Sequence, residues 1–205
     1  MAKARRDLPV VAFKSQQAFD AWLASQPEGT RGLWLKIARK SSGITSVSRD
    51  EAVDAALCHG WIDGQLDSFD GNYWLISFTP RQSTSIWSEK NRARALELVK
   101  LGEMRPAGLR EIDRAKADGR WERAYASVST AKVPDDLRAA LARNKKAAAF
   151  FETLDSKNRY AVLHRTHTAK KAETRAARIA KFVAMLAKGE TIHPQKAKAP
   201  KRVKT

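Results

Sequence analysis

The chain has 205 residues, 43% of them hydrophobic and six of them tryptophan, which is enough for one domain or two small domains with a buried core. Its net charge of +17 attracts phosphate groups, whether on nucleic acid or on anionic lipid, although such charge is often only a solvated surface. No apolar run approaches the roughly 18 residues of a membrane-spanning helix, and the basic first residues lack the apolar segment of a signal peptide, so we expect a cytoplasmic protein without a membrane span.

Helix caps and apolar alternation predict an α+β domain at residues 10–125, after a disordered lead at 1–9. Ser48 begins a capping-box sequence, which is typical of a helix start. The dipeptide Asp70-Gly71 between two apolar runs is typical of a β-hairpin. The expected elements are a helix at 16–26, a strand at 33–37, a helix at 49–59, strands at 61–68 and 72–79, helices at 89–101 and 106–118, and a short helical segment from 121 to 125. They predict a small antiparallel sheet covered by helices.

The last third of the chain is expected to be entirely helical. A linker at 126–133 precedes a compact four-helix domain at 134–189. Its helices are expected at 134–143, 145–154, 156–168 and 172–188. Residues 190–205 show no apolar periodicity and are expected to be a disordered basic tail.

The stretch from Cys58 to Asn91 concentrates aromatic and polar side chains and is therefore the candidate ligand-binding region. The candidate residues are Trp61, Asp63, Asp67, Arg81, Ser85, Trp87 and Asn91. The tryptophans of this stretch are most simply core residues of a small sheet, because aromatic rings dominate burial. The alternative is that one or two of Trp61, Trp74 and Trp87 form a stacking platform in a cleft.

Three charged residues of this stretch are expected to lie close together. Positions two apart on a strand share a face, so Asp63 and Asp67 are expected on one face, within reach of Arg81 on the neighbouring strand. One interpretation is a structural ion pair, and the other is an arginine that binds an anionic ligand. Paired carboxylates also suit general acid–base catalysis, although no motif supports that chemistry here.

Polar residues also gather where the helix at 89–101 begins. Ser88 is expected to cap this helix, and Ser85 and Asn91 lie beside it. A helix start with spare amides, serines and a nearby arginine is also a natural site for an anion.

Catalytic and metal-binding patterns are weak in this chain. Adjacent helix residues point about 100° apart, so Cys58 and His59 do not form a nucleophile–base pair, and Cys58 is expected to be a small buried hydrophobe. A single cysteine excludes an internal disulfide and a cysteine-built zinc site, and the four histidines lack metal-binding spacing. We therefore expect no metal, no cofactor and no enzymatic role.

The basic charge is concentrated in the last third of the chain. Residues 132–205 contain 19 Lys and Arg against 6 Asp and Glu. The densest patch, Lys170, Lys171, Arg175 and Arg178, falls at the start of the last helix, where basic residues oppose the helix dipole. This patch is the candidate contact for an anion or a nucleic acid, although no recognition motif gives it sequence specificity.

Several segments of the chain resemble the YdeI/OmpD-associated, or bacteriocin-protection, family. The matching segments are 50–53, 56–58, 60–64, 78–81, Ser85, 87–88, Asn91, 102–104, 106–108, 119–121, 133–137, 140–141, Phe151, 173–175 and 178–179. They cover about residues 30–189 in order, and His59 stands where the family pattern has an aromatic residue. The resemblance implies a role in tolerance to bacteriocin or envelope stress, and it implies no established reaction.

The sequence therefore favours a non-enzymatic cytoplasmic binding protein of this type, whose partner is a protein or an anionic ligand. One alternative is a module that binds nucleic acid weakly through its basic helices and tail. The other alternative is an enzyme with a cleft around Trp61, Asp63 and Arg81.

Overall fold

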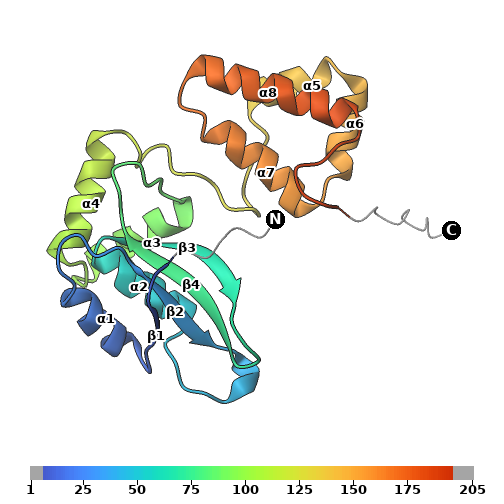
Figure 1. The fold of residues 1–205 in the computed structure, drawn as a ribbon. Coiled ribbons are helices and arrows are strands. Elements are labelled where there is room, and N and C mark those ends of the chain that lie inside the picture. Colours follow the sequence, from blue (N-terminus) through green and yellow to red (C-terminus); the bar gives the residue numbers. More distant parts are fainter. Residues whose placement is uncertain (1–6, 196–205) are drawn as a thin grey trace. The chain divides into compact units, whose positions relative to one another are not determined.

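The computed structural model describes residues 7–195, and the chain forms two compact units, one up to Ala124 and one from Tyr125 onward (Figure 1). The first unit contains a sheet and helices, and the second is helical, so the expected α+β class is confirmed. Within the described range, no helix is both long enough and apolar enough to cross a membrane.

A four-stranded sheet forms the base of the first unit. In spatial order its strands are β1 (Val10–Ala12), β2 (Leu33–Ala38), β4 (Tyr73–Pro80) and β3 (Trp61–Ser68). The sheet is mixed rather than purely antiparallel, because β1 runs parallel to β2. The sequence does not predict β1, because three residues are too few to show an alternating pattern.

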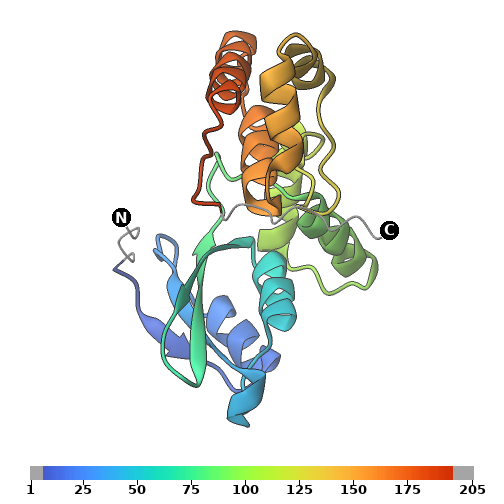
Figure 2. The same ribbon diagram turned by 90° about the vertical axis from the view of Figure 1, so that its right-hand side faces the viewer.

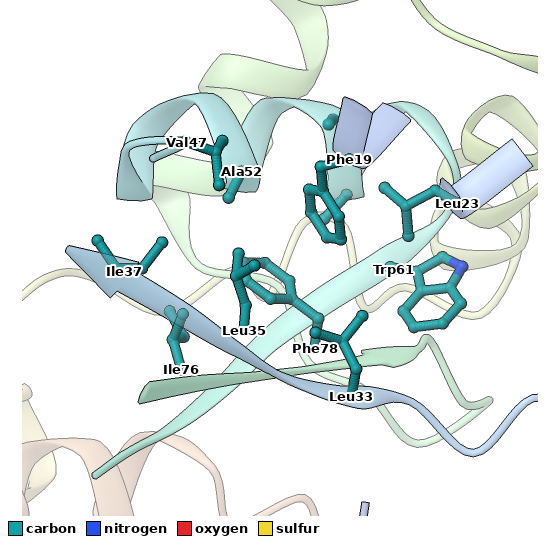
Figure 3. Close-up of a cluster of buried hydrophobic side chains, with 12 residues drawn as sticks. Phe19, Leu23, Leu33, Leu35, Ile37, Val47, Ala52, Trp61, Ile76 and Phe78 are labelled. Carbon is teal, nitrogen blue, oxygen red and sulfur yellow. The ribbon is translucent and has the colours of Figure 1, made fainter. Parts of the chain in front are cut away.

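Helices α1 (Gln16–Ala24) and α2 (Arg49–Cys58) cover one face of this sheet. The strands contribute every second residue to that face, as the pleat of a β-strand requires. The buried cluster comprises Phe19, Leu23, Leu33, Leu35, Ile37, Val47, Ala52, Ala55, Ala56, Trp61, Ile76 and Phe78 (Figure 3). Trp61 is therefore a core residue of the sheet as predicted, Phe78 lies in the same cluster, and Trp74 packs against it.

Helices α3 (Glu89–Lys100) and α4 (Pro106–Ala117) contact α2 and build a second cluster. Its centre is a T-shaped pair of rings, Trp87 and Trp121, with centroids 4.8 Å apart. The prediction that Trp87 joins Trp61 around the sheet is therefore wrong. Trp87 lies directly before α3 and follows that helix into the second cluster rather than following β4 into the first.

A β-bulge interrupts the pairing of β3 with β4. Asp63 pairs with Phe78, but beyond Gly64 and Gln65 the register shifts, and Asp67 pairs with Leu75. Phe78 and Leu75 are an odd number of residues apart, so they point to opposite faces of the sheet. Asp63 and Asp67 therefore also lie on opposite faces, and the prediction that they share one face is wrong.

Side-chain contacts explain where the bulge falls. The hydroxyl of Ser77, on β4, accepts a hydrogen bond of 2.8 Å from the amide of Gln65. A Cβ atom on residue 64 would lie 2.7 Å from the same hydroxyl, so any residue other than glycine would force the Ser77 side chain to move. The bulge thus depends on a glycine and on a serine of the neighbouring strand.

The predicted helix starts in the first unit are confirmed. Ser15, Ser48 and Ser88 each accept a backbone amide as N-cap residues, and Ser48 forms the full capping box. The short helix predicted from 121 to 125 does not form. Gly119 ends α4 with a φ of 72°, and the chain continues in turns.

Four helices form the second unit: α5 (Asp135–Ala142), α6 (Lys145–Thr153), α7 (Ser156–His167) and α8 (Ala172–Ala187) (Figure 2). Helix α8 packs on each of the other three. The buried residues that they share are Leu137, Leu141, Ala147, Phe151, Leu154, Val162, Leu163, Ile179, Phe182 and Leu186. This apolar set at helical spacing is what the sequence predicts for a small bundle.

Residues 191–195 return to the start of α7, although the sequence predicts them as part of a disordered tail. The amide of His193 donates to the Asn158 side chain at 2.9 Å, and the Asp155 amide donates to the Gln195 side chain at 2.8 Å. These contacts are polar, so an apolar pattern does not reveal them. The rest of the predicted tail, 196–205, and residues 1–6 of the predicted lead lie outside the described residues.

Candidate functional site

The aromatic and arginine side chains of the predicted ligand-binding region are buried. Trp61 and Arg81 are 5% exposed, and Trp87 is 2% exposed. The guanidinium carbon of Arg81 lies 3.6 Å from the centre of the Trp87 ring, which is a close cation–π contact. Trp61 faces Trp22 of α1 in a T-shaped contact at 5.7 Å. These residues therefore hold elements together instead of forming a solvent-facing platform.

A second buried arginine, which the sequence does not predict, contacts the loop that follows Arg81. Arg120 is 3% exposed, donates to the carboxylate of Asp118, and donates at 2.7 Å to the carbonyl oxygen of Ser85. The Ser85 hydroxyl in turn accepts from the Gln82 amide at 2.9 Å. Ser85 thus fixes the loop between β4 and α3.

Asp63 joins three elements of the first unit. Its carboxylate accepts from Arg49 at the start of α2, at 3.3 Å, and from the Asn91 side chain on α3, at 3.2 Å. The direct contact that we predict between Arg81 and Asp63 or Asp67 stays a prediction. Because Asp63 and Asp67 lie on opposite faces, they do not form the acid–base pair considered from the sequence.

The predicted anion site at the start of α3 is largely occupied by the protein itself. Ser88 caps the amide of Asn91 at 3.1 Å, and the Asn91 side chain is bound to Asp63. These contacts use the groups that an anion would need.

The only cysteine borders an open hollow of about 410 Å³ between α1, α2 and residues 102–105. Burial, together with the nearby carboxylate of Asp20, raises the pKa of the Cys58 thiol to about 11. His59 bonds to Asp20 at 2.9 Å, and Arg105 lies 3.5 Å from the same carboxylate. A thiol that stays protonated is a poor nucleophile, so Cys58 has the buried structural role that the sequence predicts.

Trp74 lines a second hollow, which the sequence does not predict. The hollow has a volume of about 460 Å³ and lies where β2 ends and α2 begins. Its apolar wall includes Trp74, Ile37 and Ile44, and its basic residues are Arg39, Lys40 and Arg49. We call this site the Trp74 hollow.

The wall of the Trp74 hollow is held by the loop between β2 and α2. The Ser46 hydroxyl accepts from the Ala38 amide at 3.0 Å, and the Val47 amide donates to the Phe13 carbonyl oxygen at 2.9 Å. Gly43 turns the loop with a φ of 67°. Figure 3 shows Ile37 and Val47 at one end of the buried cluster, opposite Trp61. The hollow therefore continues that end of the core to the surface.

The two arginines of the basic patch, Arg175 and Arg178, have internal roles that the sequence does not reveal. Arg175 forms two hydrogen bonds with the carboxylate of Asp136 and donates to the Thr166 carbonyl oxygen. Arg178 donates at 2.7 Å to the carbonyl oxygen of Arg165. These carbonyl groups end α7, where a positive charge is favourable. Contacts with the end of α7 thus offset the unfavourable position of these arginines at the start of α8. Their position therefore does not indicate a binding partner.

A small aromatic hollow of about 60 Å³ lies beside α7. The Tyr125 and His164 rings meet edge to face at 4.9 Å, and the Tyr160 hydroxyl donates to the Ala126 carbonyl oxygen at 3.2 Å. Burial and the nearby His167 lower the pKa of His164. These contacts fasten residues 125–126 to α7. Among the described residues, no group of histidine, cysteine and acidic side chains could hold a metal ion.

Comparisons with known proteins match two separate parts of the chain, one within each of the two compact units. Residues 130–189 match the family described as Bacteriocin-protection, YdeI or OmpD-Associated. Residues 11–111 match a different family, a domain of unknown function (DUF8412), and this range contains most of the N-terminal segments on which the resemblance was based. No curated protein and no solved structure is a significant match. Over residues 130–189, the chain is therefore similar to the bacteriocin-protection, YdeI or OmpD-associated family.

Proposed function

We propose that this chain is a non-enzymatic binding protein of the cytoplasm that contributes to bacteriocin or envelope-stress tolerance. The family of residues 130–189 supports the link to tolerance. The observation that carries the proposal is that the chemically active side chains of the first unit serve its structure.

Three features of the first unit support a binding role rather than a catalytic role. The thiol of Cys58 is held protonated by burial and by nearby carboxylates. Arg81 is stacked on Trp87 in the interior, and Asp63 accepts hydrogen bonds from Arg49 and Asn91. An enzyme with a cleft around Trp61, Asp63 and Arg81 would need these groups at a solvent-facing cavity.

The proposal is tested by a survival assay under bacteriocin challenge. The gene is deleted in the organism that encodes the chain, and the wild-type, Cys58→Ser and Asp63→Asn forms are returned at matched protein levels. Both substitutions are nearly isosteric, and each removes one candidate nucleophile or base. We expect both variants to protect as well as the wild type. A variant that folds normally but no longer protects would indicate a reaction at that residue.

A second candidate function, weak binding of nucleic acid, is favoured by the charge of the second unit. Residues 125–195 contain 14 Lys and Arg against 6 Asp and Glu, and both Lys170 and Lys171 are exposed. Such binding depends on counterion release, so it should fade between about 50 and 200 mM salt. Fluorescence anisotropy with a mixed-sequence duplex tests it. Binding that persists at high salt would instead indicate specific recognition.

A further inference from the structure

We propose that the Trp74 hollow binds a small anionic ligand with a flat apolar body, such as an aromatic carboxylate. This inference rests on the proposed binding function and gives it a site and a class of ligand.

The apolar part of the site comes from the edge of the core. Trp74 pairs with Ile37 across the sheet, and both line the hollow, so they present one continuous apolar surface. Trp74 is only partly buried, and Ile44 on the facing loop is 39% exposed. An indole face beside an exposed aliphatic side chain is a suitable surface for an aromatic ring.

The charged part of the site selects for a negative group. Arg39, Lys40 and Arg49 line the hollow, whereas Asp50 is its one acidic lining residue. Asp50 lies 3.6 Å from the ammonium group of Lys90, which offsets its charge. The hollow therefore has a positive balance, and a planar guanidinium matches a carboxylate well.

Both arginines keep hydrogen-bonding capacity for a ligand. Arg49 contacts Asp63 through Nη2 at 3.3 Å, and its side chain is 49% exposed. Arg39 donates its Nε to the Asp70 carbonyl oxygen at 3.4 Å, a long bond that a carboxylate can replace. Each guanidinium has five N–H groups, so these contacts use only part of its donor set.

Size and rigidity favour a small molecule. The volume of about 460 Å³ lies within the roughly 300–1,000 Å³ range of small-molecule pockets. The loop that forms one wall is already fixed by Ser46 and Val47, so little ordering accompanies binding.

The test is a titration of the full ¹⁵N-labelled chain with 2-naphthoate, followed by NMR. The Trp74 indole signal is assigned by its absence in Trp74→Leu. We expect this signal and the amides of residues 39–50 to shift, with a dissociation constant of roughly 1 mM or below. The cation 2-naphthylmethylammonium should bind at least about tenfold more weakly, because the hollow has a positive balance.

Two matched variants test the role of charge. Lys40→Glu should weaken binding of 2-naphthoate about tenfold, because it reverses a charge at the hollow. Lys100→Glu makes the same change on α3, outside the residues that line the hollow, and should leave binding unchanged.

The inference is overturned if 2-naphthoate leaves the Trp74 signal in place, or if the cation binds as well as the anion. It is also overturned if Lys40→Glu and Lys100→Glu have equal effects. None of these results bears on the proposed function, which is judged by the survival of cells carrying Cys58→Ser and Asp63→Asn.

Discussion

Replacing Gly64 with alanine tests the bulge that separates Asp63 from Asp67. The new methyl group would lie 2.7 Å from the Ser77 hydroxyl, closer than any ordinary contact. Ser77 is 2% exposed, so its side chain has to leave its preferred rotamer, at roughly 0.5–1.5 kcal/mol. The Gln65 amide then loses its acceptor, which adds about 1 kcal/mol. The free energy of unfolding should fall by about 2 kcal/mol in total.

A double-mutant cycle separates this explanation from a general intolerance of alanine. Ser77→Ala removes the same hydrogen bond and should cost about 1 kcal/mol by itself. In the double variant the clash is absent, so the cost should remain about 1 kcal/mol rather than the additive value of about 3 kcal/mol. Gly71→Ala is the matched control, because no heavy atom lies within 4 Å of a Cβ there, and its effect should be within about 0.5 kcal/mol.

Urea unfolding monitored by tryptophan fluorescence is the appropriate assay. All six tryptophans lie in the first unit, so the signal reports that unit alone. The midpoint should move while the slope with denaturant stays constant. A neutral Gly64→Ala variant, or additive costs in the double variant, would refute the account of the bulge.

Three further predictions concern the cores of the two units and the contacts around α7. Trp61→Ala should lower the unfolding free energy of the first unit by about 3–5 kcal/mol, and an unchanged melting temperature would place that ring at the surface. The pKa of His164 is lowered in the folded chain by burial and by His167. As pH falls, His164 therefore binds a proton in the unfolded chain before it does so in the folded chain. The second unit should therefore lose stability as pH falls below about 6.5, and His164→Gln should reduce this loss in urea unfolding followed by circular dichroism. Asp136→Ala and Arg175→Ala should show a coupling of about 1 kcal/mol in a double-mutant cycle, since both groups are partly exposed, and a coupling of zero would contradict the structural role of this pair.

Local signals predicted most of the fold. Ser15, Ser48 and Ser88 cap helices because a cap needs only neighbouring residues in sequence. The hairpin turn is equally local: Asp70 accepts the amides of Asn72 and Tyr73.

The candidate site was less predictable because it depends on contacts between distant segments. The bulge at Gly64 is fixed by Ser77 of another strand, so a period of two along β3 could not reveal it. Trp87 packs on Trp121 rather than on the sheet, which requires knowledge of where α4 ends. For the Trp74 hollow, the available signal was the basic and polar loop after the second strand, with Arg39 and Lys40, but the sequence does not show that a tryptophan faces it.

The most direct test of the account compares Trp74→Leu with Cys58→Ser in the bacteriocin survival assay, at matched protein levels. The account predicts that Trp74→Leu loses protection, because it removes the aromatic wall of the hollow, and that Cys58→Ser keeps it. Full protection by Trp74→Leu would contradict the role of the hollow, and loss of protection by Cys58→Ser would indicate thiol chemistry instead.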